Sequence, residues 1–280
     1  MVASDPLTAS LVPPGAASWC KTFLSTSSKD RLLAASAAWP VTRCMWRSIE
    51  RLVQPGIMAH YWHRKLWIEE CCREALTDGV ERVVVVGAGF DTLALRLAPQ
   101  FPQVEFVEID HPATQHQKRA AIARCPQYFA GTNNLSFISA NLGVERLPES
   151  IDGKRTLLIA EGVLMYLAPQ KVDQLFASLS RSRSPIQVIF SFMTQWDDGS
   201  CGFRPRSRWV ERWLASRKEP FTWSIRSQAL ESYLRTFGLL IVKRATTRDL
   251  ALLHGVSDST LDGEDLALIV NQPLVEDSKQ

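Results

Sequence analysis

Short apolar runs alternate with amphipathic stretches along most of this 280-residue chain. The runs are rich in β-branched residues, as at residues 83–86, which is typical of strands buried on both faces of a parallel sheet. The pattern predicts strands at 81–86, 103–110, 134–139, 155–160 and 187–193. Apolar residues at helical spacing predict helices at 41–53 and 58–76 and helices that begin near Ser28, Leu93, Pro112, Pro169 and Ser227. Strands that alternate with helices predict a doubly wound, mainly parallel α/β sheet.

The end of the chain departs from this alternation. Two apolar runs, 239–245 and 266–270, are joined by about 20 residues with little helical pattern, so we expect them to pair antiparallel at one edge. The sheet then has seven strands. We divide the chain into an N-terminal helical cap (1–79), an α/β core (80–193), an insertion (194–226), and a C-terminal helix with the closing strands (227–280).

The turn after the first strand carries the clearest chemical signal. Gly87-Ala88-Gly89 follows the apolar run directly, and two glycines allow a tight turn and a close approach of a ligand to the backbone. The third glycine of the dinucleotide fingerprint is absent, because Thr92 stands there, so a plain strand-to-helix turn is an open alternative. The second strand ends in Asp110, near the spacing at which a carboxylate accepts hydrogen bonds from a ribose. Together these features predict a nucleotide site.

Composition narrows the class of protein. The net charge is +3 and no long basic stripe is present, so neither a nucleic acid nor another polyanionic partner is expected. No run of 18 apolar residues and no secretory signal is visible, which predicts a cytoplasmic protein without a membrane partner. The cysteines lack metal-site spacing, so we expect reduced thiols and no metal at Cys20, Cys44, Cys71, Cys72, Cys125 and Cys201.

Several blocks of sequence resemble the leucine carboxyl methyltransferase family. They are Val-Val-Gly-Ala-Gly-Phe-Asp-Thr (85–92), Glu-Ile-Asp-His-Pro (108–112), Ala-Glu-Gly-Val-Leu-Met-Tyr-Leu (160–167) and Glu-Pro-Phe-Thr-Trp (219–223). Arg64 falls where the family has an arginine on the helix before the first strand. The resemblance covers roughly residues 58–245. It implies a class I methyltransferase sheet and S-adenosyl-L-methionine as the cofactor.

The resemblance also implies roles for individual residues. Arg64 would clamp the methionine carboxylate, Asp110 would take the ribose hydroxyls, and Glu161 would face the cofactor's ammonium group. The family usually has Asp where this chain has Asn141, which could equally be a turn residue. The implied cofactor-binding set is Arg64, Gly87, Ala88, Gly89, Asp91, Asp110, His111, Asn141, Leu142, Glu161 and Gly162.

The insertion is rich in tryptophan and arginine. It is expected to form a substrate lid with the N-terminal helices, and the proposed acceptor-binding residues are Tyr166, Trp196, Arg206, Arg208, Trp209 and Arg212. Two interpretations stay open: an aromatic and cationic wall for an anionic substrate, or an amphipathic helix with tryptophans in the core and arginines in water.

The chemistry of the acceptor depends on whether the site holds a base. A carboxylate is ionised at neutral pH and needs no base, whereas a phenol or alcohol does. The sequence offers only His60, His63 and His111 as weak base candidates, which favours carboxyl methylation of a small, anionic and partly apolar molecule by a monomer or homodimer. Alternatives are methylation of a hydroxyl, of a protein C-terminus or of a modified tRNA base. From a different class, a nicotinamide dehydrogenase or a non-catalytic cofactor-binding module remains open.

Overall fold

The computed structural model describes residues 12–24, 39–124, 133–143, 153–217, 220–253, 255 and 261–271. The helix expected to begin near Ser28 lies outside these residues. The described helices are α1 (Ala16–Leu24), α3 (Pro40–Val53), α4 (Ile57–Thr77), α5 (Leu93–Leu97), α6 (Pro112–Ala123), α8 (Pro169–Ser180), α9 (Arg208–Arg217), α10 (Leu230–Arg235) and α11 (Thr247–Leu253). The strands are β1 (Arg82–Val86), β2 (Glu105–Asp110), β3 (Leu135–Ser139), β4 (Thr156–Ala160), β5 (Ile186–Met193), β6 (Leu239–Ala245) and β7 (Glu264–Asn271).

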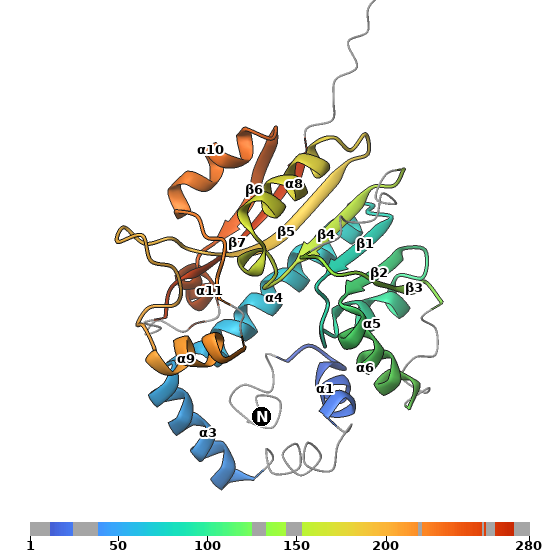
Figure 1. Ribbon diagram of the computed structural model, residues 1–280. Helices are drawn as coiled ribbons and strands as arrows, with labels where there is room; N and C mark the ends of the chain where they lie inside the picture. The colour runs from blue at the N-terminus through green and yellow to red at the C-terminus, as the bar shows by residue number, and fades with distance from the viewer. Residues whose placement is uncertain are drawn as a thin grey trace, which may run out of the picture.

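These strands form one sheet with the order β3-β2-β1-β4-β5-β7-β6 (Figure 1). β1 pairs in parallel with β2 on one side and with β4 on the other, so the strand order reverses at β1. β7 inserts antiparallel between β5 and β6. The prediction of a seven-stranded, mainly parallel sheet with antiparallel strands at one edge is therefore confirmed. In open α/β sheets, ligands bind at the carboxyl ends of the strands where the order reverses, which here lies between β1 and β4.

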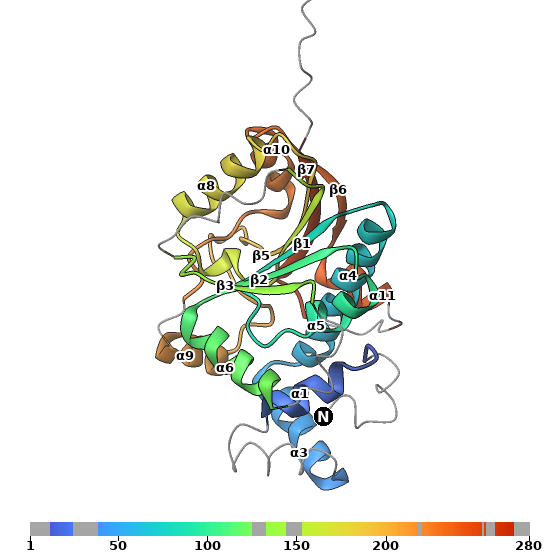
Figure 2. The same ribbon diagram turned by 90° about the vertical axis from the view of Figure 1, so that its right-hand side faces the viewer.

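The apolar strands are buried because helices cover both faces of the sheet (Figure 2). Val83 and Val85 belong to a core cluster with residues of α1, α4, α5, α6 and α11. Val84 and Val86 belong to a second cluster with residues of α8 and α10. The β1 valines thus face alternate sides, which explains why the run is continuously apolar.

Two local predictions were wrong. Ser227 was expected to cap a helix, but its hydroxyl donates to Asp265 on β7, and α10 begins only at Leu230, after the 3₁₀ turn Ser227–Ala229. The connection between β6 and β7, predicted to have little helical content, contains α11. Thr246 begins this helix by exchanging hydrogen bonds with Asp249, a short-range signal that the apolar pattern does not contain.

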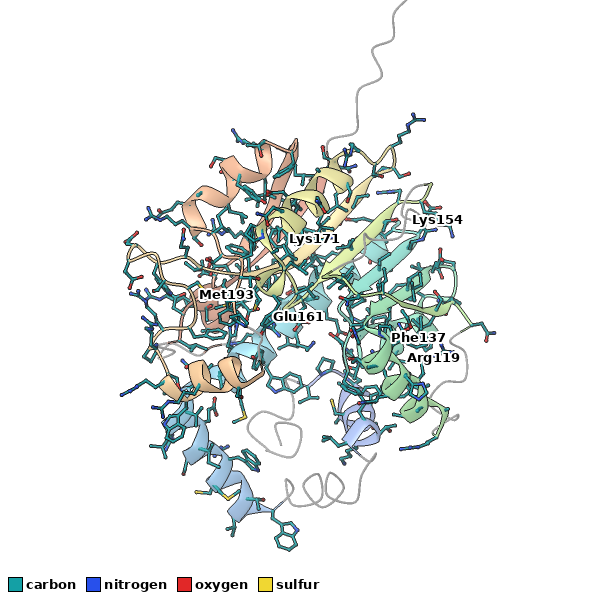
Figure 3. The ribbon with its side chains drawn as sticks, in the orientation of Figure 1. Arg119, Phe137, Lys154, Glu161, Lys171 and Met193 are labelled. Carbon is teal, nitrogen blue, oxygen red and sulfur yellow. The ribbon has the colours of Figure 1, made fainter. Side chains whose placement is uncertain are left out.

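The carboxyl ends of the parallel strands point toward α1, α3 and α9. Lys154 and Glu161 lie at opposite ends of β4, and Glu161 is at the end nearer those helices (Figure 3). The polar residues expected to bind a ligand follow β1, β2, β3 and β4 and therefore meet at this edge. None of the described helices is long and apolar enough to span a membrane.

Candidate functional site

The turn after β1 requires its glycines. Gly87 has φ of 64°, and a Cβ there would lie 2.5 Å from Cγ2 of Val163. Gly89 has φ of 47°, again in the left-handed region that favours glycine. The amide of Gly87 donates to the carbonyl of Ile109 at 2.8 Å, which ties the turn to the end of β2. The turn thus depends on glycine at both positions, because neither the backbone angles nor the space beside Gly87 suits a side chain.

Asp110 ends β2 and faces this turn. Its carboxylate accepts from the amide of Gly89 and, at 2.5 Å, from the amide of His111. Among the described residues no cation pairs with Asp110, and the side chain is only half-buried. A carboxylate has about four acceptor positions, so Asp110 retains capacity for further donors such as ribose hydroxyls.

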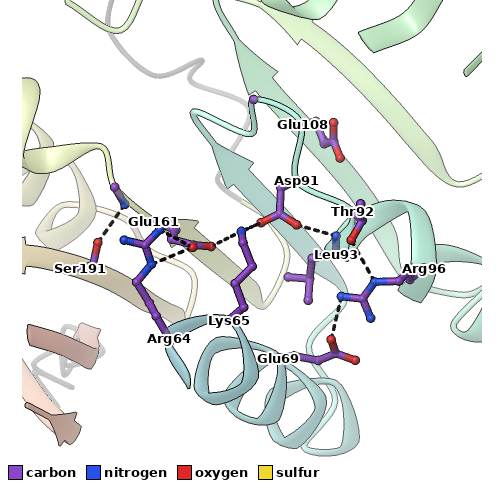
Figure 4. A network of polar contacts seen from close by, with 12 residues as sticks. Arg64, Lys65, Glu69, Asp91, Thr92, Leu93, Arg96, Glu108, Glu161 and Ser191 are labelled. Carbon is purple, nitrogen blue, oxygen red and sulfur yellow. Dashed lines mark hydrogen bonds and ion pairs between the residues drawn. The ribbon is translucent and has the colours of Figure 1, made fainter. Parts of the chain in front are cut away.

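A network of ion pairs crosses the same edge (Figure 4). The guanidinium of Arg64, on α4, donates through Nε to Glu161 at 2.8 Å and through Nη1 to both oxygens of Glu264 at 2.6 and 2.7 Å. Glu264 also pairs with Nε2 of His60 at 2.7 Å. Burial alone would lower the pKa of Arg64, but Glu264 and Glu161 raise it above its ordinary value. Burial would raise the pKa of Glu264, but Arg64 and then His60 lower it to about 2.

Lys65 extends the network to the β1 turn. Its Nζ lies 2.6 Å from Oδ2 of Asp91 and 2.8 Å from Oε2 of Glu161 (Figure 4). The other carboxylate oxygen of Asp91 accepts from the amide of Leu93 at 2.7 Å. Although burial opposes ionisation of both groups, pairing with Lys65 lowers the pKa of Asp91, and pairing with Asp91 and Glu161 raises that of Lys65. Lys65 therefore links the carboxyl ends of the two central strands.

A buried lysine on α6 holds the turn that follows β1. Lys118, on α6, is 1% exposed and pairs with Glu108 of β2 at 2.6 Å. Its Nζ also donates to the main-chain carbonyl of Asp91 at 2.7 Å. Burial raises the pKa of Glu108 to about 7, and Lys118 only partly offsets this effect. Lys118 thus fixes the backbone position of Asp91.

The remaining predicted cofactor residues follow β1, β3 and β4 at the same edge and make local contacts. Asn141 accepts from the amide of Gly143 at 3.1 Å, as a turn residue does, and Leu142 is half-buried. The amide of Gly162 donates to the hydroxyl of Ser191 at 2.8 Å. Ala88 is buried in the β1 turn.

The three histidines proposed as bases have different surroundings. His60 and His63 are each 2% exposed. His111 is exposed and begins α6, where its Nδ1 accepts from the amide of Ala113 at 3.3 Å. Only His111 among these three is therefore open to an acceptor from solvent.

The insertion places most of its proposed substrate residues in water. Arg206, Arg208 and Arg212 are exposed, and Trp209 is 66% exposed, so of the two open interpretations the one with tryptophans in the core does not hold for Trp209. Trp196 is held locally: its Nε1 donates to Gly202 at 2.9 Å, and the guanidinium of Arg204 lies 4.3 Å from its ring centroid. Tyr166 packs on Phe221, with ring centroids 5.6 Å apart.

Sequence reasoning missed Lys65, Glu264, Glu108 and Lys118. Lys65 adjoins Arg64, and its position one residue along the same helix was the available signal. Glu264 is 200 residues from Arg64, and nothing in its local sequence marks it. Pairing between β5 and β7 brings it to the site.

These residues fit S-adenosylmethionine by their chemistry. The β1 turn offers a close backbone approach, Asp110 offers free acceptor positions for ribose hydroxyls, and Glu161 with Lys65 offers opposite charges for an amino-acid group. Among the described residues, no cluster of His, Cys, Asp and Glu could hold a metal ion.

Comparison with known proteins gives a consistent result. The sequence profile of leucine carboxyl methyltransferase matches residues 2–180. A protein of Mycolicibacterium vanbaalenii, provisionally named an S-adenosyl-L-methionine-dependent methyltransferase, is 30% identical over 132 residues, which cover 45% of this chain and 42% of the relative. YktD of Bacillus subtilis, with the same provisional name, is 23% identical over 67% of this chain and 63% of the relative. The matches thus span less than two thirds of the length of either relative.

The fold is also similar to solved structures. The methyltransferase domain of bacterial CtHen1-C superposes with a TM-score of 0.50 and 12% identity, covering 75% of this chain and 97% of that domain. At this identity the likeness shows the shared fold alone.

Proposed function

Because the chain belongs to the leucine carboxyl methyltransferase family, we propose that it is an S-adenosylmethionine-dependent O-methyltransferase that forms a methyl ester on the carboxylate of a small molecule. Asp110 would hold the ribose and the β1 turn the sugar and methionine part. Asn141 and Leu142 would flank the adenine.

The state of the histidines is the observation that carries the choice of a carboxylate. His60 is paired with buried Glu264, His63 is 2% exposed, and the Nδ1 of His111 is held by the start of α6. An acceptor hydroxyl would have to give up its proton to a base as it attacks. A carboxylate carries no such proton at neutral pH, so the site can act by alignment.

The proposed reaction balances without a proton transfer. The cofactor supplies a methyl group on a sulfonium sulfur, which is a leaving group that departs neutral. The new bond joins the methyl carbon to a carboxylate oxygen, and the carbon–sulfur bond breaks. What the protein supplies is an aligned approach and exclusion of water at the carboxyl edge of the sheet.

Exposed side chains near this edge support an acceptor that is anionic and partly apolar. Arg208 and Arg212 on α9 are exposed, beside Trp209. Near the end of α3, Leu52 is 80% exposed. Gln54, which ends α3, donates to the carbonyl of Pro205 at 2.9 Å, so the two segments meet close to the start of α9. Cationic and apolar groups are thus presented together.

The test is a transfer assay with methyl-labelled S-adenosylmethionine and a panel of carboxylic acids and matched phenols. A carboxylate product is an ester that mild alkali cleaves, and its kcat/KM should stay flat from about pH 6 to 8 because the acceptor pKa lies near 4. An alkali-stable product would contradict the proposal. So would a rise in rate through about pH 6.5 that disappears in His111→Ala, because it would identify a hydroxyl acceptor with His111 as the base.

A further inference from the structure

We propose that α3 docks the protein on a lipid bilayer with anionic headgroups, and that the apolar face of the helix lies in the headgroup layer. The inference concerns a surface apart from the cofactor turn and does not depend on the proposed function. A helix that lies along a membrane does not have to span it, and none of the described helices could.

Apolar and cationic residues of α3 lie on different faces of the helix. Four apolar residues recur at helical spacing and form one stripe along it. They are Val41, Met45, Ile49 and Leu52. Arg47 and Arg51 are one turn apart and lie outside this stripe. This segregation is typical of a helix that binds where an apolar and a charged layer meet.

The apolar stripe of α3 is not part of the core. Val41 and Leu52 are 78% and 80% exposed, and Met45 is 48% exposed. Among the described residues, neither core cluster includes a residue of α3. The helix lies at the edge of the molecule, further from the sheet than α9 (Figure 1 and Figure 2). Contiguous exposed apolar residues rimmed by polar ones mark an interaction surface.

The charges of α3 favour an anionic partner. Among its side chains that the structure describes, the exposed charged ones are Arg47 and Arg51. Its acid, Glu50, is half-buried and accepts from the amide of Met58 at 3.0 Å. A second copy docked through the same face would bring the arginines of both copies together without an exposed acid on α3 to pair them. Anionic headgroups complement the arginines, while the acyl region accepts the stripe.

The half of α3 nearer its start is the part that a small acceptor leaves uncovered. Leu52 lies near Gln54, which bonds the segment before α9, but Val41 is about 16 Å away along the helix at a rise of about 1.5 Å per residue. Trp39, directly before α3, is 66% exposed at that end. Tryptophan is enriched where membranes meet water, so its position beside the stripe supports a bilayer as the partner.

Sedimentation with lipid vesicles tests the proposal on the full chain, without cofactor or acceptor. The protein should bind vesicles of phosphatidylcholine mixed with phosphatidylglycerol, and higher salt or omission of phosphatidylglycerol should weaken binding. Val41→Ser with Met45→Ser should weaken it at least about tenfold, because two apolar side chains no longer enter the bilayer. Arg51→Gln should weaken binding to the mixed vesicles by about fivefold and leave binding to pure phosphatidylcholine unchanged.

Matched variants elsewhere on the surface are the controls. Leu252→Ser removes an apolar side chain of α11 that is 64% exposed, and Arg235→Gln removes an exposed arginine of α10. Both should bind vesicles as the wild type does. Thermal melting of each variant checks that the fold is intact.

The proposal is overturned if the wild-type protein stays in solution with the mixed vesicles, or if Val41→Ser with Met45→Ser binds them as tightly as the wild type. Equal losses in the controls would overturn it too, because binding would then not be specific to α3. If the double variant instead converts a dimer of the free protein into a monomer in analytical ultracentrifugation, the stripe is an interface between copies and the bilayer is the wrong partner. The labelled-cofactor assay tests methyl transfer separately.

Discussion

Replacing Glu264 with glutamine should destabilise the protein strongly and in a pH-dependent way. The Glu264 carboxylate accepts two hydrogen bonds from Arg64, at 2.6 and 2.7 Å, and pairs with His60. Glutamine keeps the shape of the side chain but removes its charge. Arg64 then retains only Glu161 as an anionic partner in a buried position.

The magnitude follows from the pKa. The Arg64 pair lowers the pKa of Glu264 to about 2 from an ordinary value of 4.5. At 1.36 kcal/mol per pKa unit, the charged form stabilises the folded state by about 3 kcal/mol. Removing one partner of a buried ion pair costs about 3–5 kcal/mol, which agrees. Because the folded-state pKa is depressed, this stabilisation is complete above pH 4.5 and is lost as pH falls toward 2.

Chemical denaturation at several pH values measures the effect. The difference in free energy of unfolding between wild type and Glu264→Gln should be about 3 kcal/mol at pH 7 and about 1 kcal/mol smaller at pH 3.5. Glu74→Gln is the control: Glu74 pairs with Lys243 but is 46% exposed, so its loss should cost under about 1 kcal/mol. The reasoning would be refuted if Glu264→Gln lowered the free energy of unfolding as little as Glu74→Gln does. A loss of free energy of unfolding that does not vary with pH would refute it as well.

Further predictions concern the site. Asp110→Ala should weaken cofactor binding by about tenfold or more, because charge-assisted hydrogen bonds to the ribose are lost; unchanged affinity measured by calorimetry would exclude Asp110 from the ribose site. Gly87→Ala should lower the free energy of unfolding by about 1–3 kcal/mol, because φ is +64° and the new Cβ would clash with Val163. Adding Val163→Ala should remove the clash but not the backbone strain, so the double variant should recover only part of the loss. Lys118→Met should raise the pKa of Glu108 further by removing its cation and should weaken cofactor binding by about tenfold, because Lys118 anchors the Asp91 carbonyl; a calorimetric affinity equal to wild type would contradict this. Arg212→Ala should raise KM for the acceptor more than it lowers kcat, and steady-state kinetics that show the reverse would argue that Arg212 acts in the transition state.

Much of the fold could be predicted because its signals are local. The apolar runs of β1 and β4 are buried on both faces, and such burial forces a continuous apolar sequence. The strand ends also marked the site, since Gly87 and Glu161 directly follow strands and Asp110 ends one, and the carboxyl ends of these strands meet at one edge. The helices that begin at Pro112 and Pro169 were visible from proline at the first helical position.

Other features depended on partners distant along the chain. Ser227 looks like a helix cap, yet it bonds Asp265, which sheet pairing brings near. Trp209 looks like a core residue by its spacing on a helix, yet the insertion leaves it exposed. In each case the local pattern allowed two environments, and the packing of separate elements selected one.

The sequence by itself determined the strands, the glycine turn and the acids at the strand ends, because each depends on neighbouring residues alone. Only the tertiary structure decided how the charges are paired. Lys65 and Arg64 are adjacent on one helix, yet their partners differ. Arg64 pairs with buried Glu264, which lies on an antiparallel strand 200 residues further along the chain. Lys65 is half-exposed and pairs with Asp91 after β1 and Glu161 after β4. An ion pair is set by distance in space and by burial, and neither can be read from the spacing of residues along the chain.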